Sequence, residues 1–172
     1  MLSKTFVDDK SFSNLEIGAG CGNFGKVFYP KCYLTDLDEE LQKNCKVCYI
    51  DWFCDAHNLT WKNDRFDKVI MCNPHGYGFR DDEMTERLLN ELLRVLKGKD
   101  SEIIIICSRR SSYCAPDRVQ KRISSFLSKN SSISLRVEHQ EIDASILYKD
   151  YIFKETLGDQ TMPSSKITIH VE

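Results

Sequence analysis

Four consecutive isoleucines and a cysteine, Ile103 to Cys107, limit the fold of this chain more than any other feature. β-Branched residues without polar alternation are typical of a central strand that is covered on both faces. Before this run, the segment Asp82 to Lys97 carries leucines at helical spacing and ends in a basic turn followed by glycine. After it, Pro116 is suited to the first position of another helix. A covered strand between two amphipathic helices favours a layered α/β domain.

The rest of the chain repeats this alternation of short apolar runs and amphipathic stretches. Strands are predicted at Ser13–Ile17, Cys32–Thr35, Val47–Phe53 and Phe66–Cys72. Helices are predicted at Gly22–Phe28, Asp38–Asn44 and Asp82–Lys97, and from Pro116 onward. Further strands are predicted at Ile133–Ile142, Ile146–Phe153 and Lys166–Val171. Alternating elements indicate a mostly parallel sheet, and the C-terminal strands predict an antiparallel closing hairpin.

Composition places the chain among ordinary globular proteins. It has 172 residues, 41% of them hydrophobic, and we expect one domain over residues 1–172. A formal net charge of -2 argues against a generally basic nucleic-acid binder. No segment approaches the ~20 apolar residues of a membrane span, and Asp8 and Asp9 interrupt the place of a signal peptide's apolar region. We therefore expect a cytoplasmic protein without membrane contact.

Eight cysteines are many for a chain of this length. In an intracellular protein they are expected to be free, mostly buried thiols. The spacing Cys45-x-x-Cys48 followed by Cys54-x-x-His57 resembles a zinc ligand set. Asp55 lies inside that stretch and has another use below, so we predict that the cysteines bind no metal.

A glycine-rich loop, Gly18-Ala19-Gly20-Cys21-Gly22, separates the first predicted strand from the first helix. Glycines there permit a tight turn and the close approach of a ligand to the backbone. Asp36 ends the next strand, where a carboxylate can accept hydrogen bonds from both hydroxyls of a ribose. The spacing Gly20-x-Gly22-x-x-Gly25 also fits a nicotinamide-dinucleotide fingerprint, so these residues alone leave the nucleoside open.

Three later segments bear on which nucleoside is bound. They are Asp55-Ala56 after the third strand, Asn73-Pro74 after the fourth, and Leu93 to Gly98 before the fifth. In this order and spacing, the chain from about Ser13 to Cys107 resembles the class I S-adenosylmethionine-dependent methyltransferase family. The resemblance implies a Rossmann-like fold and S-adenosyl-L-methionine as cofactor. It implies cofactor contacts from Glu16, Gly18, Ala19, Gly20, Gly22, Asp36, Leu37, Asp55, Ala56 and Asn73.

Within that resemblance the glycines lie against the methionine part of the cofactor and Asp36 takes the ribose hydroxyls. Asp55 accepts from the adenine amino group, and Ala56 offers its backbone N–H. Two simpler interpretations stay open. Asp55 can cap a helix or turn, and Asp36 can be a solvated turn residue.

The acceptor motif departs from the family pattern. In the amino-methyltransferases an Asn or Asp, two prolines and an aromatic residue hold the acceptor. Asn73 and Pro74 match, His75 replaces the second proline, and the aromatic residue comes one position late, at Tyr77. His75 is a candidate general base or an ordinary loop histidine. Tyr77 or Phe79 can stack on a flat substrate, and Phe79 can equally belong to the core.

The acceptor is left open, with a small molecule, an RNA or a protein as candidate partners. Lys and Arg outnumber Asp and Glu between Lys97 and Arg136. The cluster comprises Arg109, Arg110, Arg118, Lys121 and Arg122. It fits either an RNA backbone or a solvated helix face.

We predict methyl transfer from S-adenosylmethionine to a nitrogen or oxygen acceptor. The catalytic candidates are Asn73, Pro74, His75 and Tyr77. One alternative is a methyltransferase-fold binding protein without catalysis. The other is a nicotinamide-dinucleotide enzyme.

Overall fold

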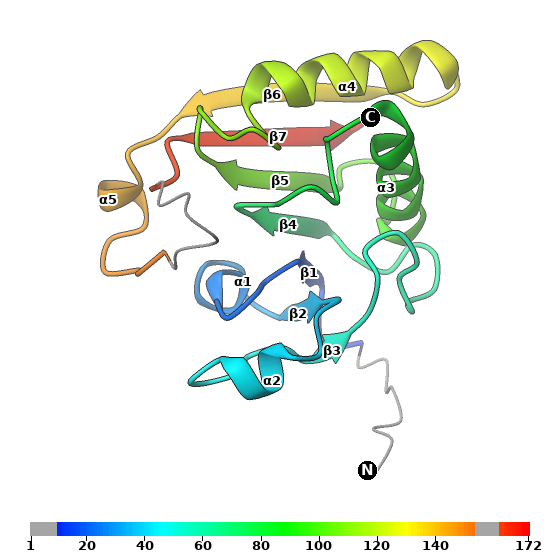
Figure 1. Ribbon diagram of the computed structural model, residues 1–172. Helices are drawn as coiled ribbons and strands as arrows, with labels where there is room; N and C mark the ends of the chain where they lie inside the picture. Colours follow the sequence, from blue (N-terminus) through cyan, green and yellow to red (C-terminus); the bar gives the residue numbers. More distant parts are fainter. Residues whose placement is uncertain (1–9, 154–161) are drawn as a thin grey trace.

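The structure is a computed structural model that describes residues 10–153 and 162–172. The described residues form a seven-stranded sheet with the order β3-β2-β1-β4-β5-β7-β6 (Figure 1). The strands are β1 (Asn14–Ile17), β2 (Cys32–Asp36), β3 (Trp52–Phe53), β4 (Lys68–Cys72), β5 (Glu102–Cys107), β6 (Leu135–Glu141) and β7 (Ser165–Val171). β1 to β5 pair in parallel, and β7 is antiparallel to both β5 and β6. The predicted α/β fold with an antiparallel C-terminal strand is confirmed.

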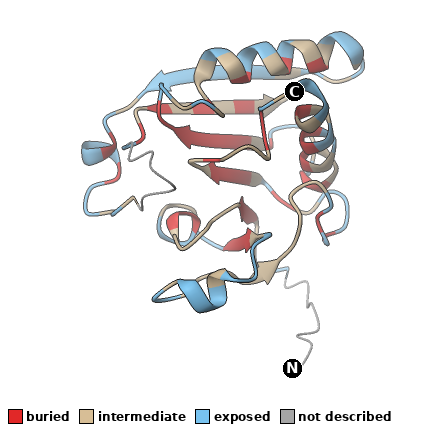
Figure 2. Cartoon of the chain, viewed as in Figure 1, coloured by how far each residue is buried: buried red, intermediate tan, exposed pale blue. Residues whose placement is uncertain are grey.

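Helices cover both faces of this sheet. They are α1 (Phe24–Phe28), α2 (Leu41–Asn44), α3 (Asp82–Val95), α4 (Pro116–Lys129) and α5 (Ala144–Leu147). Ile103 and Ile105 of β5 belong to the core that includes α3 and α4, whereas Ile104 and Ile106 belong to the core that includes α1 and α5. Figure 2 shows buried residues concentrated on the central strands. The isoleucine run is therefore covered on both faces, as its composition predicted.

Helix α3 begins where the sequence places it but ends earlier. The Asp81 carboxylate accepts a hydrogen bond from the Met84 N–H at 2.9 Å and caps the first turn. Leu96 leaves the helix to form a parallel bridge with Phe66, and the Lys97 N–H donates to the Phe66 carbonyl oxygen. Because of this bridge, Leu96 and Lys97 lie outside α3, although the sequence predicted them within the helix. Phe66 likewise lies outside β4, although it was predicted to begin that strand.

The segment Ile146–Phe153 is not a strand, and that prediction was wrong. Asp143 caps α5 by accepting from the Ser145 N–H at 3.0 Å. The rings that follow pack on the short helix α1: Tyr148 and Phe24 have centroids 5.0 Å apart, and Tyr151 and Phe24 5.5 Å. Because α1 has only five residues, these aromatic rings cover sheet surface that a longer helix would cover.

The predicted strand Val47–Phe53 is also shorter in the structure, where only Trp52–Phe53 pairs with β2. Asp51, the residue before this strand, makes side-chain contacts with β2 and α1 instead. Its carboxylate accepts from the Leu34 N–H at 2.9 Å and from the Lys26 ammonium at 2.7 Å. A strand of two residues leaves the edge of the sheet short beside β2.

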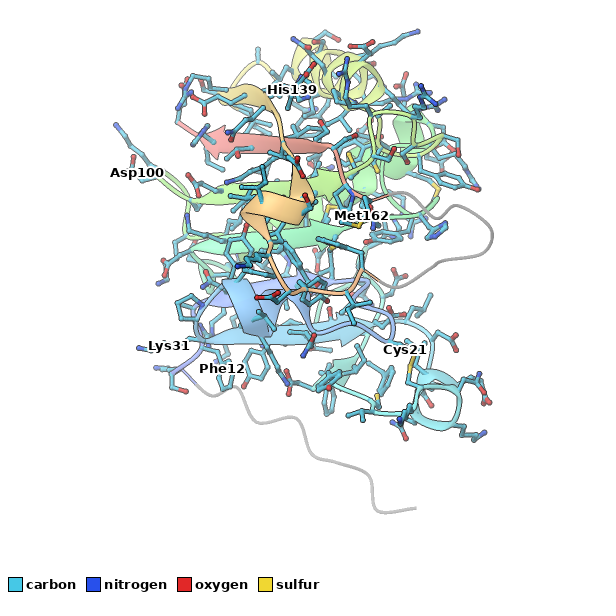
Figure 3. All side chains as sticks on the ribbon, turned by 90° about the vertical axis from the view of Figure 1, so that its left-hand side faces the viewer. Phe12, Cys21, Lys31, Asp100, His139 and Met162 are labelled. Carbon is cyan, nitrogen blue, oxygen red and sulfur yellow. A yellow bond between two sulfur atoms is a disulfide. The ribbon has the colours of Figure 1, made fainter. Side chains whose placement is uncertain are left out.

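A disulfide joins Cys21 to Cys45, so the expectation of free thiols throughout was wrong. The bond ties the glycine-rich loop to the residue that follows α2, and Figure 3 shows it beside that helix. The free cysteines of the described chain are Cys32, Cys48, Cys54, Cys72, Cys107 and Cys114. None of the helices in the described ranges is long and apolar enough to cross a membrane.

The carboxyl ends of the parallel strands lie at one edge of the sheet, which is the edge where a ligand is expected. The parallel strands all end there, and so does β6, because Cys107, Ser165 and Glu141 are aligned across β5, β7 and β6. The connection that leaves β6 therefore begins at the same edge, where α5 follows (Figure 1). Ligands of open α/β sheets bind at this carboxyl edge.

Candidate active site

A cavity of about 730 Å³ opens at the carboxyl edge of the sheet. Such a volume lies in the upper part of the range of small-molecule pockets. Of the residues predicted to bind the cofactor or the acceptor, all line this cavity except Pro74, which is buried away from it. The structure therefore brings the segments after β1, β2, β3 and β4 together around one space.

The glycine-rich loop is folded back against the end of β2. Gly18 and Gly20 have φ angles of 65° and 57°, in the left-handed region that favours glycine. The Ala19 N–H donates to the Thr35 carbonyl oxygen at 3.0 Å, and the Gly20 N–H donates to Asp36 Oδ2 at 2.9 Å. These bonds hold the loop and the Asp36 carboxylate in a fixed relation before any ligand binds.

Asp36 is a carboxylate of the cavity that two backbone N–H groups hold in place. Besides the Gly20 N–H, it accepts from the Asp38 N–H at 3.0 Å through Oδ1. An ionised carboxylate offers about four acceptor positions, so two remain for other donors. Leu37, which follows Asp36, is 68% exposed at the rim. The arrangement can receive the two neighbouring hydroxyls of a ribose.

Asp55 and Ala56 follow β3 and line the same cavity. Asp55 Oδ1 accepts from the His57 N–H at 2.9 Å and lies 3.0 Å from the His57 ring Nδ1. Burial alone would raise the pKa of Asp55, but these hydrogen bonds with His57 hold it below its ordinary value. Asp55 therefore closes a turn, as the simpler interpretation held, and it also lines the cavity.

Tyr77 lies over the glycine-rich loop. Its hydroxyl donates to the Ile17 carbonyl oxygen at 3.2 Å. A Cβ on Gly18 would lie 2.4 Å from that hydroxyl oxygen, so Gly18 leaves room for the tyrosine. Burial raises the pKa of Tyr77 far above its ordinary range, which keeps the phenol neutral. Phe79, the other candidate for stacking on a substrate, is fully buried in the core.

Asn73 and His75 form the part of the cavity that follows β4. Asn73 has a φ angle of 49°, which asparagine tolerates better than most residues, and its N–H donates to the Ile106 carbonyl oxygen at 2.7 Å. The His75 ring lies 5.3 Å from the Tyr113 ring, centroid to centroid. Two polar side chains, an amide and an imidazole, thus face the same space.

Glu16 is buried beneath the loop, where its Oε2 accepts from the Gly25 N–H at 2.7 Å. Burial raises the pKa of Glu16 to about 7, and the Gly25 N–H and the Lys26 charge only partly oppose this. A carboxyl group with a raised pKa keeps its proton in the folded protein between about pH 4.5 and 7, where the unfolded chain has lost it. Its contribution to stability is complete below this window and is lost as the pH rises through it.

We therefore expect Glu16→Gln to flatten the pH dependence of stability. The free energy of unfolding of the parent protein should fall relative to the variant by about 3 kcal/mol between pH 4.5 and 7. The Gln side-chain oxygen can still accept from the Gly25 N–H, which makes the two proteins comparable. Urea unfolding at several pH values measures the difference. Parallel curves for the two proteins would contradict the raised pKa.

Several lining residues escaped prediction from the sequence. Tyr151 and Phe153 reach the cavity from the connection between β6 and β7, and Phe24 reaches it from α1. The Tyr151 hydroxyl contacts the Asn23 N–H across 128 residues of chain, so no local pattern could indicate it. Asp38 and Leu41, in contrast, follow Asp36 closely and could have been included from their position alone.

The basic cluster is largely engaged within the protein. Arg109 pairs with Glu141 at 2.8 Å, Arg122 pairs with Asp82 at 2.6 Å, and Arg118 donates to the Arg80 carbonyl oxygen at 3.3 Å. In the described part of the chain no three His, Cys, Asp or Glu side chains are grouped to hold a metal. Cys45, one of the zinc-ligand candidates, is bonded to Cys21 instead.

No protein-family model matches the sequence, and no curated protein matches it. Solved structures do match. A S-adenosylmethionine-dependent methyltransferase from Archaeoglobus fulgidus is 15% identical with a TM-score of 0.58, over 95% of this chain and 87% of that one. One from Clostridium acetobutylicum is 10% identical with a TM-score of 0.59, over 93% and 84%.

A third similar structure is a complex between the Trm112 methyltransferase activator and a methyltransferase from Haloferax volcanii. It is 14% identical with a TM-score of 0.58, over 94% of this chain and 82% of that one. At these identities the likeness concerns the fold. The chain has the fold of S-adenosylmethionine-dependent methyltransferases, as the resemblance implied.

Proposed function

We propose that this protein transfers the methyl group of S-adenosylmethionine to a nitrogen or oxygen acceptor. The observation that carries the proposal is the composition of one cavity. It holds the glycine-rich loop with Asp36 and Asp55 on the side of β2 and β3, and Asn73 with His75 after β4. The similarity in fold to known methyltransferases supports the same assignment.

The residues present fit the cofactor. Asp36 has free acceptor positions for the ribose hydroxyls, and Asp55 lines the cavity where an adenine amino group would lie. Nothing lies within 4 Å of a Cβ built on Gly20, so the loop leaves open space at that point. When bound, the cofactor supplies a methyl group on a sulfonium, which needs only a correctly placed nucleophile.

The chain's own residues would supply that placement. The Asn73 side-chain oxygen can accept from an acceptor N–H or O–H and aim its lone pair, and His75 can take the proton that is released. Tyr77, through its contact with Gly18, holds the loop against which the acceptor approaches. Positioning of this kind supplies much of the rate in a single displacement.

Two alternatives differ from this proposal in testable ways. A dinucleotide enzyme commonly has an all-parallel sheet of two similar halves, whereas here β7 is antiparallel and separates β5 from β6. A binding protein without catalysis would bind the sulfur nucleoside but label no acceptor. Thermal shift with S-adenosylmethionine, S-adenosylhomocysteine and NAD separates the ligands.

The similar Haloferax structure is a complex with an activator protein, so binding of a protein partner by this chain is a further possibility to test.

Asp36→Ala is expected to weaken binding of S-adenosylmethionine by about ten- to a hundredfold, because hydrogen bonds to a charged group are lost. Calorimetry measures the dissociation constant. Glu39→Ala is the matched control, since Glu39 is an exposed carboxylate of the same loop that does not line the cavity. Circular dichroism establishes that both variants fold. An unchanged dissociation constant in Asp36→Ala would mean that the ribose lies elsewhere.

A further inference from the structure

The connection from β6 to β7 contributes side chains to the cavity although it is remote from it in sequence. In Figure 1 its described part, with α5, lies on the side toward which the β4, β5 and β6 arrows point. Tyr151 and Phe153 of this connection line the cavity and pack in the same core cluster as Phe24 and Cys72. Cys72 directly precedes Asn73, and Asn73 lines the same cavity as the two rings.

Tyr151 is attached to the glycine-rich loop by its hydroxyl. The Asn23 N–H donates to the Tyr151 hydroxyl oxygen at 3.2 Å. A Cβ on Gly22 would lie 3.2 Å from the same oxygen, which is a tight approach. Burial raises the pKa of Tyr151 well above its ordinary value, so the ring is neutral. The Tyr151 hydroxyl is therefore engaged with the glycine-rich loop, and the Tyr151 ring is left to form part of the cavity lining.

Phe24, Tyr151 and Phe153 together form what we call the aromatic wall. The Tyr151 and Phe153 rings are 4.9 Å apart at an interplanar angle of 72°, and the Phe24 and Tyr151 rings meet at 80°. These edge-to-face contacts fix the rings relative to one another. A wall of fixed rings favours a ligand with a flat apolar body.

The Asp and Glu side chains that line the cavity have no basic side chain beside them in the described lining. Asp36, Asp38 and Asp55 belong to the end formed after β2 and β3, and no Lys or Arg is found among the described residues that line the cavity. Glu16, buried beneath the loop, also lines the cavity, and the uncharged polar side chains of the lining include the Asn73 amide and the Tyr151 phenol. A phosphate or carboxylate placed there would lose water without gaining a cation, which is costly.

We propose that the acceptor is a small, flat, uncharged nitrogen compound whose ring packs against Tyr151 and Phe153. This rests on the proposed methyl transfer and adds its substrate class and two specificity residues. The acceptor nitrogen forms the new N–C bond with its lone pair as the C–S bond breaks, and that bond's electron pair stays on sulfur. The proton of the acceptor N–H leaves to His75 or to water. A nitrogen that must offer its lone pair cannot be permanently cationic.

The test measures binding rather than turnover. The protein is saturated with S-adenosylhomocysteine and titrated by calorimetry with benzimidazole, indazole, free adenine and benzimidazole-5-carboxylate. At least one of the three uncharged probes should bind. Benzimidazole should bind at least about tenfold more tightly than its carboxylate, because only the carboxylate carries a charge that the wall leaves unpaired.

Variants then locate the ring contact. Tyr151→Ala and Phe153→Ala should each weaken binding of the bound probe about tenfold, the scale of one lost ring contact. Ile152→Ala is the matched control, because Ile152 lies between them and is 83% exposed. Phe153→Leu tests the loss of the ring with its apolar bulk retained.

The outcomes are separable. If S-adenosylhomocysteine does not bind, the proposed function fails and this inference fails with it. If it binds but none of the three uncharged probes does, the inference alone is overturned. It is equally overturned if the carboxylate or a single-stranded oligonucleotide binds more tightly than every flat probe, or if Phe153→Ala and Phe153→Leu bind the probe as the parent does.

Discussion

Asn73→Ala is expected to transfer methyl about 100-fold more slowly than the parent protein, while its dissociation constant for S-adenosylmethionine stays within about twofold. The side chain lines the cavity after β4, where we propose that the acceptor binds, and the ribose and adenine candidates are Asp36 and Asp55. Removing the amide should disturb the alignment of the acceptor and leave the cofactor's hydrogen bonds intact. Single-turnover kinetics and calorimetry on the same variant measure the two quantities.

The backbone of Asn73 requires a second variant as a control. Its φ angle of 49° is unfavourable for alanine, so Asn73→Ala also strains the chain. Asn73→Gly relieves that strain and still lacks the amide. Both variants should be slow if the amide positions the acceptor. A glycine variant that transfers methyl at the parent rate would assign the effect to the backbone instead.

Opening the disulfide between Cys21 and Cys45 should lower the free energy of unfolding by about 3 kcal/mol. The two cysteines are 24 positions apart, and the bond restricts the unfolded chain over that loop. The same bond joins the glycine-rich loop to the segment after α2, and Cys21 and Leu41 both line the cavity. Reduction should therefore also weaken binding of the cofactor.

Urea unfolding with and without a dithiol reductant measures the stability change, and Cys45→Ser should behave like the reduced protein in both conditions. Cys48→Ser is the matched control, because Cys48 is free and three residues away. Thiol titration of the denatured, unreduced protein should find two thiols fewer than its eight cysteines. A full count of thiols, with stability unaffected by the reductant, would exclude the bond.

The parts of the fold that the sequence predicted are those with a strong local pattern. The run Ile103 to Ile106 has the composition of a strand covered on both faces, and the structure buries all four side chains. The leucines of α3 repeat at helical spacing, and Leu88, Leu89 and Leu92 are buried. The segment Ile146–Phe153 lacked such a pattern. Its aromatic residues suit a strand, but their rings are used against α1, a contact that local sequence does not encode.

The candidate site divides in the same way. Gly18, Asp36, Asp55 and Asn73 each follow a strand closely, and strand ends of a parallel sheet meet at one edge, so their grouping could be predicted. Their roles toward a ligand stay predictions. The pairing of Cys21 with Cys45 depends on how the loop and α2 approach each other, which spacing alone does not reveal. Tyr151 reaches the loop from a position 128 residues further along the chain than its partner Asn23.

The close approach of Tyr77 to Gly18 gives this glycine a structural role that does not depend on a ligand. A methyl group at Gly18 would collide with the tyrosine hydroxyl at 2.4 Å, whether or not a nucleoside is bound. Gly18 is thus required by its own backbone, which has a φ angle of 65°, and by the tyrosine, so a glycine at this position does not by itself indicate a bound nucleoside.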